Sequence, residues 1–164
     1  MDNLFKGIHN INLDSKGRLG IPITYRDHIM GLLKGSMVIT IDTEEKCLLL
    51  YPSGIWSKIQ SKINDLPSFN KNARRIQRLL IGHAEDIDVD SSGRILISRP
   101  LREYASLAKK IILIGQGDKF EIWDQNSWNE NVDKWREEVT SNDDAEALSD
   151  ISIWLMVTTT KYLV

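Results

Sequence analysis

The sequence predicts an α+β fold, mainly β, that is built from two similar halves. Three observations carry this prediction. Residues 12–19 (NLDSKGRL) return as residues 88–95 (DVDSSGRI), at an offset of 76. Apolar and polar residues alternate on both sides of each block, as in half-buried strands. Apolar residues at helical spacing follow each strand region. The similar order of features in both halves indicates a tandem duplication, with the halves packed about a pseudo-twofold axis.

Each half begins with a predicted β-hairpin. The alternating apolar positions are Ile11, Leu13, Leu19 and Ile21 in the first half, and Ile87, Val89, Ile95 and Ile97 in the second. Residues 14–17 (DSKG) and 90–93 (DSSG) separate them, and Asp first with Gly fourth suits a type I turn. The aspartate side chain accepts backbone N–H bonds, and glycine permits a positive φ. Arg18 and Arg94 follow at once, so both lie at or beside a hairpin tip.

Helices and a second strand pair complete each half. Short helices are predicted over 25–33 and 101–108, with Pro22 and Pro100 near their starts. The predicted strand pairs join 37–41 to 47–51 and 110–114 to 120–123. By residues 50 and 122 the offset has fallen to 72, so the second copy has lost about one turn.

Longer helices follow the second strand pair of each half. Apolar residues at helical spacing predict helices over 56–66, 73–83 and 128–139. Pro67 separates the first two. The segment from 151 to 164 is apolar again.

Length and composition restrict the class of protein. A chain of 164 residues holds one ordinary domain or two small ones. With 41% hydrophobic and 27% charged residues it is not a disordered chain. The one cysteine, Cys47, excludes an internal disulfide and a cysteine-rich zinc site, and fits a reducing cytoplasm. No secretory signal or transmembrane stretch is recognisable, so we expect a cytoplasmic protein without a membrane partner.

Charge is distributed unevenly along the chain. Residues 1–116 carry 17 basic and 12 acidic side chains, a net of +5, whereas residues 117–164 carry 4 and 11, a net of −7. A mildly basic body with an acidic C-terminal segment binds a polyanion on one face only. The alternative is that the acidic part is an ordinary solvated helical face.

The two Asp-x-x-x-Arg turns carry the strongest functional signal. An Asp–Arg pair that stabilises a tight turn explains one copy. Two copies, each with an arginine beside glycine on an exposed tip, favour binding of phosphates or base edges by Arg18 and Arg94 with help from Lys16. The planar guanidinium grips phosphate or guanine through two parallel hydrogen bonds.

A second basic cluster, Arg74, Arg75 and Arg78, lies on a predicted helix. Arg74 and Arg78 are four residues apart and share one face of the helix, where their like charges repel unless an anion neutralises them. DNA and the acidic groups of a neighbouring subunit are equally good partners for this cluster.

Other site chemistries lack support in the residues. The twelfth position of an EF-hand counted from Asp88 is Arg99, which excludes calcium. The three histidines lack metal spacing, and nucleophile and nucleotide-binding motifs are absent. A hydrolase that uses Asp14 and Asp90 as paired carboxylates needs them close together, whereas the turns place them on separate tips. We therefore expect no catalytic residues, no metal, no cofactor and no small-molecule substrate.

Several long motifs together resemble the MraZ family of bacterial transcription regulators. They are residues 12–18 (NLDSKGR), 47–52 (CLLLYP), 74–84 (RRIQRLLIGHA) and 90–94 (DSSGR), and the resemblance extends from about Phe5 to Ser152. It implies a duplicated swapped-hairpin, AbrB-like β-barrel with helices outside it. The implied boundaries are 5–55 for the first repeat, 56–83 for connecting helices, 84–127 for the second repeat and 128–164 for the C-terminal helix and tail.

The resemblance also implies a function. Members form ring-shaped homo-oligomers, bind short direct repeats in the promoter of the division and cell-wall gene cluster, and repress that cluster, including their own gene. The implied DNA contacts are Arg18, Arg94, Lys16 and Ser15, and the turn-shaping residues are Asp14, Gly17, Asp90 and Gly93. An AbrB-like antitoxin, which binds DNA and a toxin partner, is the alternative.

Two features depart from the family pattern. Ser92 stands where the first turn has Lys16, so the two tips need not bind DNA equally. The apolar tail 153–164 runs past the expected end of the family, and either docks on a neighbour or lies exposed.

Overall fold

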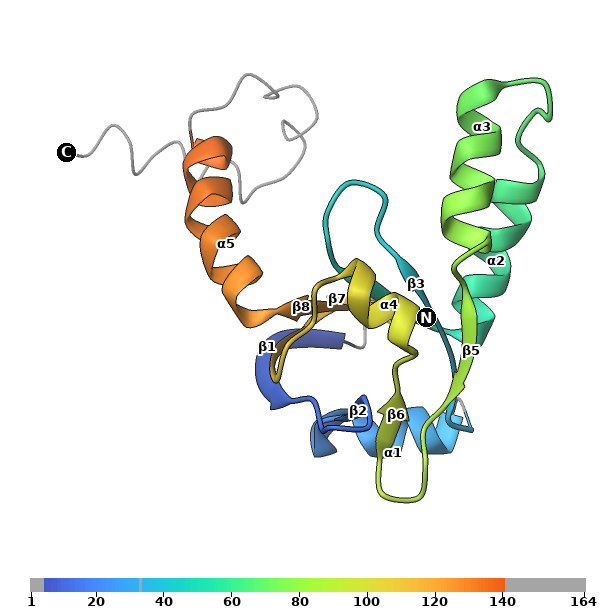
Figure 1. Cartoon of the computed structure of the whole chain (residues 1–164). Coiled ribbons are helices and arrows are strands. Elements are labelled where there is room, and N and C mark those ends of the chain that lie inside the picture. The colour runs from blue at the N-terminus through green and yellow to red at the C-terminus, as the bar shows by residue number, and fades with distance from the viewer. Residues whose placement is uncertain (1–4, 33, 141–164) are drawn as a thin grey trace. The chain divides into compact units, whose positions relative to one another are not determined.

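The computed structural model describes residues 5–32 and 34–140, which fall into two compact units, 1–125 and 126–164. The tail 153–164 lies outside the described residues. The strands of the first unit are β1 (Phe5–Asn12), β2 (Arg18–Gly20), β3 (Ser36–Ile41), β4 (Leu48–Pro52), β5 (Glu85–Asp88), β6 (Arg94–Leu96), β7 (Lys110–Gly117) and β8 (Phe120–Asp124). They form a six-stranded sheet of order β1-β7-β8-β4-β3-β5 and a two-stranded ribbon, β2–β6 (Figure 1).

Both sheets contain strands of both halves, and several neighbouring strands come from different halves. β1 pairs with β7, β4 with β8 and β3 with β5, and each of these pairs joins a strand of the first half to one of the second. β2 and β6 also come from different halves. The counterparts of β1, β3 and β4 in the other half are β5, β7 and β8. When each strand is replaced by its counterpart, the same order results, read from the opposite edge of the sheet. The halves are therefore interleaved rather than folded separately.

The predicted first hairpin of each half is wrong as a strand pair. In the first half only an isolated bridge, Leu13 to Leu19, joins the two arms. Apart from this bridge, β1 pairs with β7 and β2 pairs with β6. The reason is burial: pairing β2 with β6 places Leu19 and Ile95 side by side in the core, each fully buried. Alternation along a chain identifies a strand but does not identify its partner.

The second strand pair of each half is confirmed. β3 pairs with β4 from Met37 to Ile41, and β7 pairs with β8 from Ile111 to Gly115. The class is α+β with mostly antiparallel strands, as predicted. The predicted β-barrel is not closed in the described residues, because β1 and β5 are the edges of the large sheet. The swapped-hairpin, AbrB-like duplication stays a prediction.

Helices of the first unit follow the predicted order. They are α1 (Ile23–Leu32), α2 (Ser53–Asn64), α3 (Lys71–Ile76) continued by the π-helical turn η1 (Gln77–Ile81), and α4 (Arg99–Tyr104). Helix α1 has 10 residues and α4 has 6. The strand register shows that the offset falls from 76 to 74 between β2 and β3, and from 74 to 72 in the connection between β3 and β4. None of the described helices combines the length and apolar character needed to cross a membrane.

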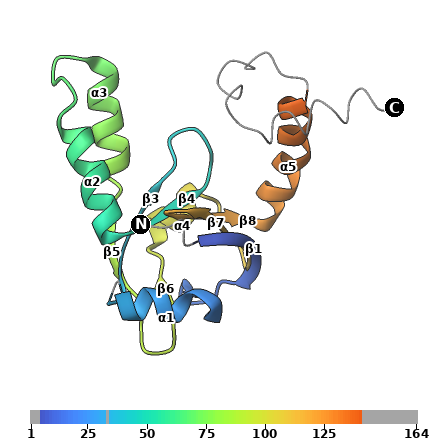
Figure 2. The same cartoon turned by 180° about the vertical axis from the view of Figure 1, so that it is seen from behind.

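Helices α2 and α3 lie side by side as a pair (Figures 1 and 2). Trp56 of α2 is buried against Tyr51, with ring centroids 5.8 Å apart, and the side-chain amide of Gln77 donates to the Ile63 carbonyl at 3.1 Å. The Asn70 side chain caps α3 by accepting from the N–H groups of Asn72 and Ala73. This pair is anchored to the sheet through α2, which contacts β3 and β4.

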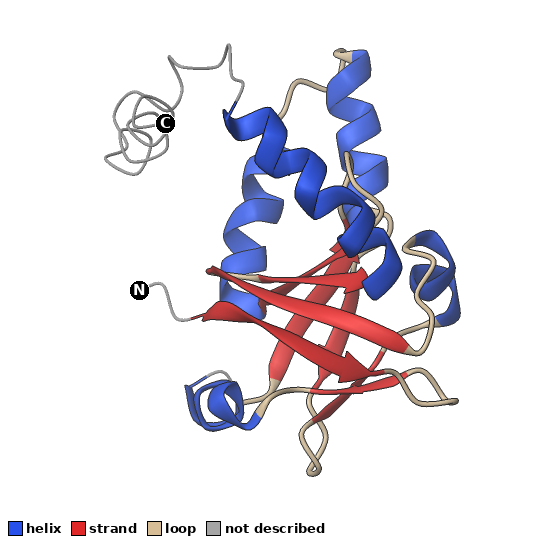
Figure 3. Cartoon of the chain, turned by 90° about the vertical axis from the view of Figure 1, so that its left-hand side faces the viewer, coloured by secondary structure: helices blue, strands red, loops and turns tan. Residues whose placement is uncertain are grey.

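A single apolar cluster joins the two sheets, which Figure 3 shows as layers with helices around them. Both halves supply it: Phe5, Leu19, Ile21, Ile39 and Leu48 come from the first, and Ile95, Ile97, Leu113, Phe120 and Ile122 from the second. The rings of Phe5 and Phe120 lie 4.2 Å apart between centroids. The core is therefore complete only when both halves are present.

Helix α5 (Gln125–Thr140) begins at the last residue of the first unit and provides the described part of the second. Its predicted apolar face is supported by Trp128 and Trp135, whose rings meet edge to face at 5.5 Å.

The first prediction concerns the shared core. Leu19→Ala should lower the free energy of unfolding by about 2–5 kcal/mol, because a fully buried leucine leaves a cavity between the two sheets. Leu96→Ala is the control, since Leu96 is 59% exposed and lies one residue from the equivalent buried position, Ile95. Urea unfolding at one fixed protein concentration measures both. Equal destabilisation by the two variants would contradict the placement of Leu19.

Candidate nucleic-acid interface

Turn 1, residues 14–18, is built around the carboxylate of Asp14. Its Oδ1 accepts from the backbone N–H groups of Lys16 and Arg18, both at 2.9 Å. The Gly17 N–H donates to the Asp14 carbonyl at 3.0 Å, and the Asp14 N–H donates to the Arg18 carbonyl at 2.9 Å. The second oxygen, Oδ2, accepts from Nε of Arg18 at 2.7 Å. One carboxylate therefore fixes both the turn and the arginine.

Turn 2, residues 90–94, repeats this arrangement. Asp90 Oδ1 accepts from the N–H groups of Ser92 at 2.8 Å and Arg94 at 2.9 Å, and Oδ2 accepts from Arg94 Nε at 3.1 Å. The predicted turn chemistry is confirmed in both copies.

The turn hydrogen bonds also set the ionisation of the two aspartates. The Arg18 N–H, followed by the Arg18 guanidinium and the Lys16 N–H, lowers the pKa of Asp14 to about 2. The Arg94 N–H lowers the pKa of Asp90 in the same way. Each carboxylate is committed to its own turn and stays ionised at neutral pH, which does not suit a general acid or base.

Each turn is docked on the other half of the chain. The Gly17 carbonyl accepts from the Ile97 N–H at 2.9 Å, and the Gly93 carbonyl accepts from the Ile21 N–H at 2.8 Å. Both glycines have positive φ, +85° and +74°, where a side chain is strained. The residues that follow β6 and β2 thus hold the two turns through backbone hydrogen bonds.

Arg18 and Arg94 lie on the same face of this ribbon. Leu19 and Ile95 point into the core, so the residues on either side of them point outward. Arg18 pairs with Leu96 and Arg94 pairs with Gly20, which makes the two arginines diagonal neighbours. Diagonal neighbours in an antiparallel pair are about 7–8 Å apart at the backbone. The structure therefore brings together two arginines that are 76 residues apart in the sequence.

Each aspartate orients the guanidinium group of its arginine but does not occupy all of its hydrogen-bond donors. The side chains of Arg18 and Arg94 are 32% and 38% exposed, and each pairs with its aspartate through Nε alone. Across residues 5–32 and 34–140 their terminal nitrogens have no hydrogen-bond or ion-pair partner. The two terminal nitrogens of each arginine, which form the fork of the guanidinium group, are therefore available to bind a ligand. Ser15 and Lys16 are exposed on the tip of turn 1.

Comparison with known proteins agrees with these motifs. A family model described as "MraZ protein, putative antitoxin-like" matches twice in succession, over residues 4–79 and 80–151. The chain belongs to the MraZ family. A relative from Alkalilimnicola ehrlichii is 45% identical over 92% of the chain and 100% of its own length. Relatives from Legionella pneumophila and Coxiella burnetii are 50% and 48% identical, each over 86% of the chain and 93% of its own length. All three are named "Transcriptional regulator MraZ".

The two tips of this MraZ-family chain differ in charge and shape. Turn 1 carries Lys16 where turn 2 carries Ser92. The ribbon position opposite Arg94 is Gly20, whereas that opposite Arg18 is the exposed Leu96. The strand before each turn differs as well: β5 (EDID) carries three acidic residues, and the equivalent positions of β1, residues 9–12 (HNIN), carry none. The surroundings of turn 1 are therefore the more basic.

The second basic cluster is not joined to the turns. Arg74, Arg75 and Arg78 are exposed on α3 and η1, and Figures 1 and 2 show α3 away from β2 and β6. Arg75 donates to the Asn72 side chain at 3.3 Å, and no ion pair of the three is found in the described part of the chain. Its role as a DNA or subunit contact stays a prediction.

Sequence reasoning missed one cluster of polar groups at the end of the β3–β4 pair. Ligand atoms of Asp42, Cys47 and Glu121 lie within 4.8 Å of one another. Cys47 is fully buried, and this burial raises the pKa of its thiol and disfavours the thiolate that binds metals. Asp42 accepts from the N–H groups of Glu44 and Glu45, and Glu121 accepts from the Trp123 indole. Protein hydrogen bonds account for both carboxylates, so we assign no metal here.

The glycine of turn 1 gives the second prediction. Gly17→Ala should destabilise the protein by more than about 1 kcal/mol, because φ is +85° and the new Cβ would lie 2.9 Å from the Arg102 guanidinium. Gly31→Ala is the matched control: Gly31 lies in α1 with open space around its Cβ position, and alanine there should stabilise the helix by about 0.5–1 kcal/mol. The midpoint of chemical unfolding checks both signs. A neutral Gly17→Ala would argue against this backbone conformation.

The pKa of Asp14 gives the third prediction. A lowered pKa means that the contribution of the turn to stability is complete above the ordinary value of 3.8 and is lost as pH falls through about 2. The Asp14 carboxyl carbon, followed by NMR in aspartate-labelled protein, should titrate near pH 2. The same aspartate in a free peptide of residues 12–20 should titrate near 3.8. Equal midpoints in protein and peptide would show that the turn hydrogen bonds are absent in solution.

Proposed function

We propose that this chain is a DNA-binding transcription regulator that inserts the β2–β6 ribbon into the major groove. The observation that carries the proposal is the shared outward face of Arg18 and Arg94, each held by an aspartate at Nε with its fork free. The names of its relatives, "Transcriptional regulator MraZ", support the same class of function. The major groove of B-DNA admits a two-stranded β-ribbon.

The spacing of the two arginines suits base pairs about two steps apart. Their backbones are about 7–8 Å apart, and successive base pairs are about 3.4 Å apart along a strand. Arg18 and Arg94 therefore reach base edges or phosphates separated by about two steps. Asp14 and Asp90 hold each guanidinium in one orientation, which reduces the conformational entropy lost on binding.

Higher-order assembly extends this contact in the proposal. One ribbon neutralises few phosphates and binds weakly, so we infer a homo-oligomeric ring that presents many ribbons to successive direct repeats. The regulated promoter is that of the division and cell-wall gene cluster, including the protein's own gene, and the protein acts there as a repressor. In this proposal the protein is cytoplasmic and nucleoid-associated, has no catalytic activity, and uses Lys16 and Ser15 as auxiliary contacts.

A second candidate function is an antitoxin that binds DNA and a toxin protein. It is favoured by the words "antitoxin-like" in the description of the family model. A small protein that co-purifies in fixed stoichiometry would support it. Its absence, together with tight promoter binding, would favour the repressor.

The fourth prediction tests the arginines by fluorescence anisotropy with DNA from upstream of the protein's own gene. Arg18→Ala should weaken promoter binding by about 5- to 150-fold, because each bidentate base contact contributes about 1–3 kcal/mol. Arg94→Ala should weaken it less, since its surroundings are more acidic. Arg136→Ala, on the acidic helix α5, is the control and should bind as the wild type.

The same titrations use a scrambled duplex and two salt concentrations. Specific binding should fall steeply with salt, because phosphate contacts release counterions. Equal and weak binding to both duplexes, or an Arg18→Ala protein that is folded and binds normally, would contradict the proposal.

A further inference from the structure

A second pair of arginines lies against the two turns. A Cβ on Gly93 would lie 2.3 Å from Nε and 2.6 Å from Cζ of Arg26, so the Arg26 side chain rests directly on turn 2. Arg26 Nε donates to the Ile21 carbonyl at 2.6 Å, and Ile21 itself donates its N–H to Gly93. Helix α1 of the first half thus delivers a guanidinium onto the turn of the second half.

Arg102 mirrors this arrangement at turn 1. A Cβ on Gly17 would lie 2.9 Å from both Cζ and Nε of Arg102, which extends from α4 of the second half. Arg26 and Arg102 are equivalent positions of the repeat, 76 residues apart. We call these two residues the crossed arginines, because each one covers the turn of the opposite half.

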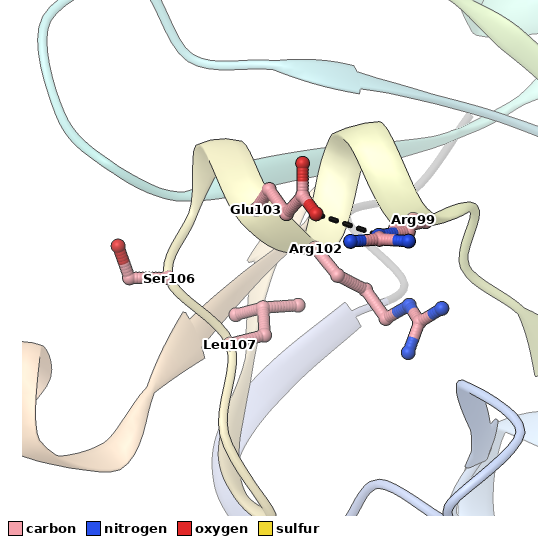
Figure 4. Close-up of a pocket in the computed structure, with 5 residues that line it drawn as sticks. All are labelled: Arg99, Arg102, Glu103, Ser106 and Leu107. Atoms are coloured by element: carbon pink, nitrogen blue, oxygen red, sulfur yellow. Dashed lines mark hydrogen bonds and ion pairs between the residues drawn. The ribbon is translucent and has the colours of Figure 1, made fainter.

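The crossed arginines carry charge that no nearby carboxylate neutralises. Among the described residues neither one forms an ion pair. The carboxylate next to Arg102 in sequence, Glu103, pairs with Arg99 at 2.7 Å, and Figure 4 shows the Arg102 guanidinium extending away from that pair. The Nε of Arg102 is buried and has no hydrogen-bond partner. A buried donor of a charged group without an acceptor is costly in free energy.

Arg26 also reaches the outward face of the ribbon. A Cβ on Gly20 would point to that face, and the nearest atom to it is Nη2 of Arg26, at 3.9 Å. Gly20 is the ribbon partner of Arg94. Nη2 of Arg26 therefore lies near the ribbon residue that pairs with Arg94. Both crossed arginines are partly exposed as whole residues.

We propose that the crossed arginines bind backbone phosphates of the DNA that the ribbon engages. Each turn then presents two arginines, one from each half: Arg18 with Arg102 at turn 1, and Arg94 with Arg26 at turn 2. This inference rests on the proposed function. Arg18 and Arg94 are anchored at Nε by aspartates and point out from the centre of the ribbon, where base edges lie. The crossed arginines lie against Gly93 and Gly17 of the turns, from which their terminal nitrogens would reach phosphates of the bound DNA.

Phosphate contacts fix position without reading sequence, and this distinguishes the two pairs. Replacing a base-reading arginine narrows the difference between promoter and scrambled duplex. Replacing a phosphate-binding arginine weakens binding to both duplexes by a similar factor. It also lowers the slope of log affinity against log salt concentration by about one.

The fifth prediction uses Arg26→Gln and Arg102→Gln in the full-length chain. Each should weaken binding several-fold to promoter and scrambled duplexes alike, and each should lower the salt slope by about one. Arg99→Gln is the matched control: it removes a guanidinium from the same helix as Arg102, but Arg99 is 81% exposed and already paired with Glu103. The control should leave the salt slope unchanged.

Lysine variants separate charge from packing. Arg26→Lys and Arg102→Lys keep the charge and most of the apolar stem, so they should restore the salt slope even if the glutamine variants lose stability. Thermal unfolding of every variant shows which are folded. A folded Arg26→Gln and a folded Arg102→Gln that keep wild-type affinity and slope would overturn the proposal.

The design keeps the two proposals apart. If Arg18→Ala loses promoter binding while the crossed arginines have no effect, the inference fails and the proposed function stands. If none of the four arginine variants changes DNA binding, the proposed function itself fails. If the crossed arginines change the promoter-to-scrambled ratio instead of the salt slope, they read bases, and the assignment to phosphate is wrong.

Discussion

The pairing of β2 with β6 is the constraint on which the rest of the structure depends. It is only three residues long, yet it places Leu19 beside Ile95 in the core and turns Arg18 and Arg94 outward on one face. The hydrogen bonds from Ile97 to Gly17 and from Ile21 to Gly93 continue the crossing on either side. Because both partners come from different halves, the core, the turns and the arginine face form together.

The turns show how one residue type serves two purposes at once. Asp14 and Asp90 satisfy backbone N–H groups that would otherwise be unpaired, and they also orient the arginines that follow. A neutral acceptor such as asparagine fills the first role but offers weaker pairing for the second. The sign of the charge at the tip is nevertheless positive, because turn 1 adds Lys16 and each turn lies under an arginine of the other half.

Local features were predictable from the sequence, and long-range pairing was not. The repeat, the roles of aspartate and glycine in each turn, and the strand pairs β3–β4 and β7–β8 followed from alternation and from Asp and Gly at fixed positions. The loss of four residues was visible as a change of offset, but only the structure divides it between the α4 region and the shorter connection of β7 to β8. The partner of β1 was not predictable, because Ile11 alternates with polar residues whether it pairs with Ile21 in a hairpin or with Ile111.

The candidate site divides in the same way. Arg18 and Arg94 stood out because each lies in a recognisable motif. The closeness of Arg18 and Arg94 in space was not predictable, because it depends on the register of a ribbon that joins residues 76 apart in the sequence. Arg26 and Arg102 appeared in the sequence only as matching positions of the repeat. What distinguishes them is contact with Gly93 and Gly17, and no local pattern encodes that contact.

The interleaved sheet has a consequence for how the chain is made. Phe5 pairs with Gly117, so the first strand has no partner until more than a hundred further residues have left the ribosome. At about 5–20 residues per second, that wait lasts roughly 5–20 s. During it the first half exposes apolar residues such as Leu19 and Ile39 that only the second half covers. Synthesis therefore passes through an interval in which a nascent first half can be completed by a second half from a neighbouring chain.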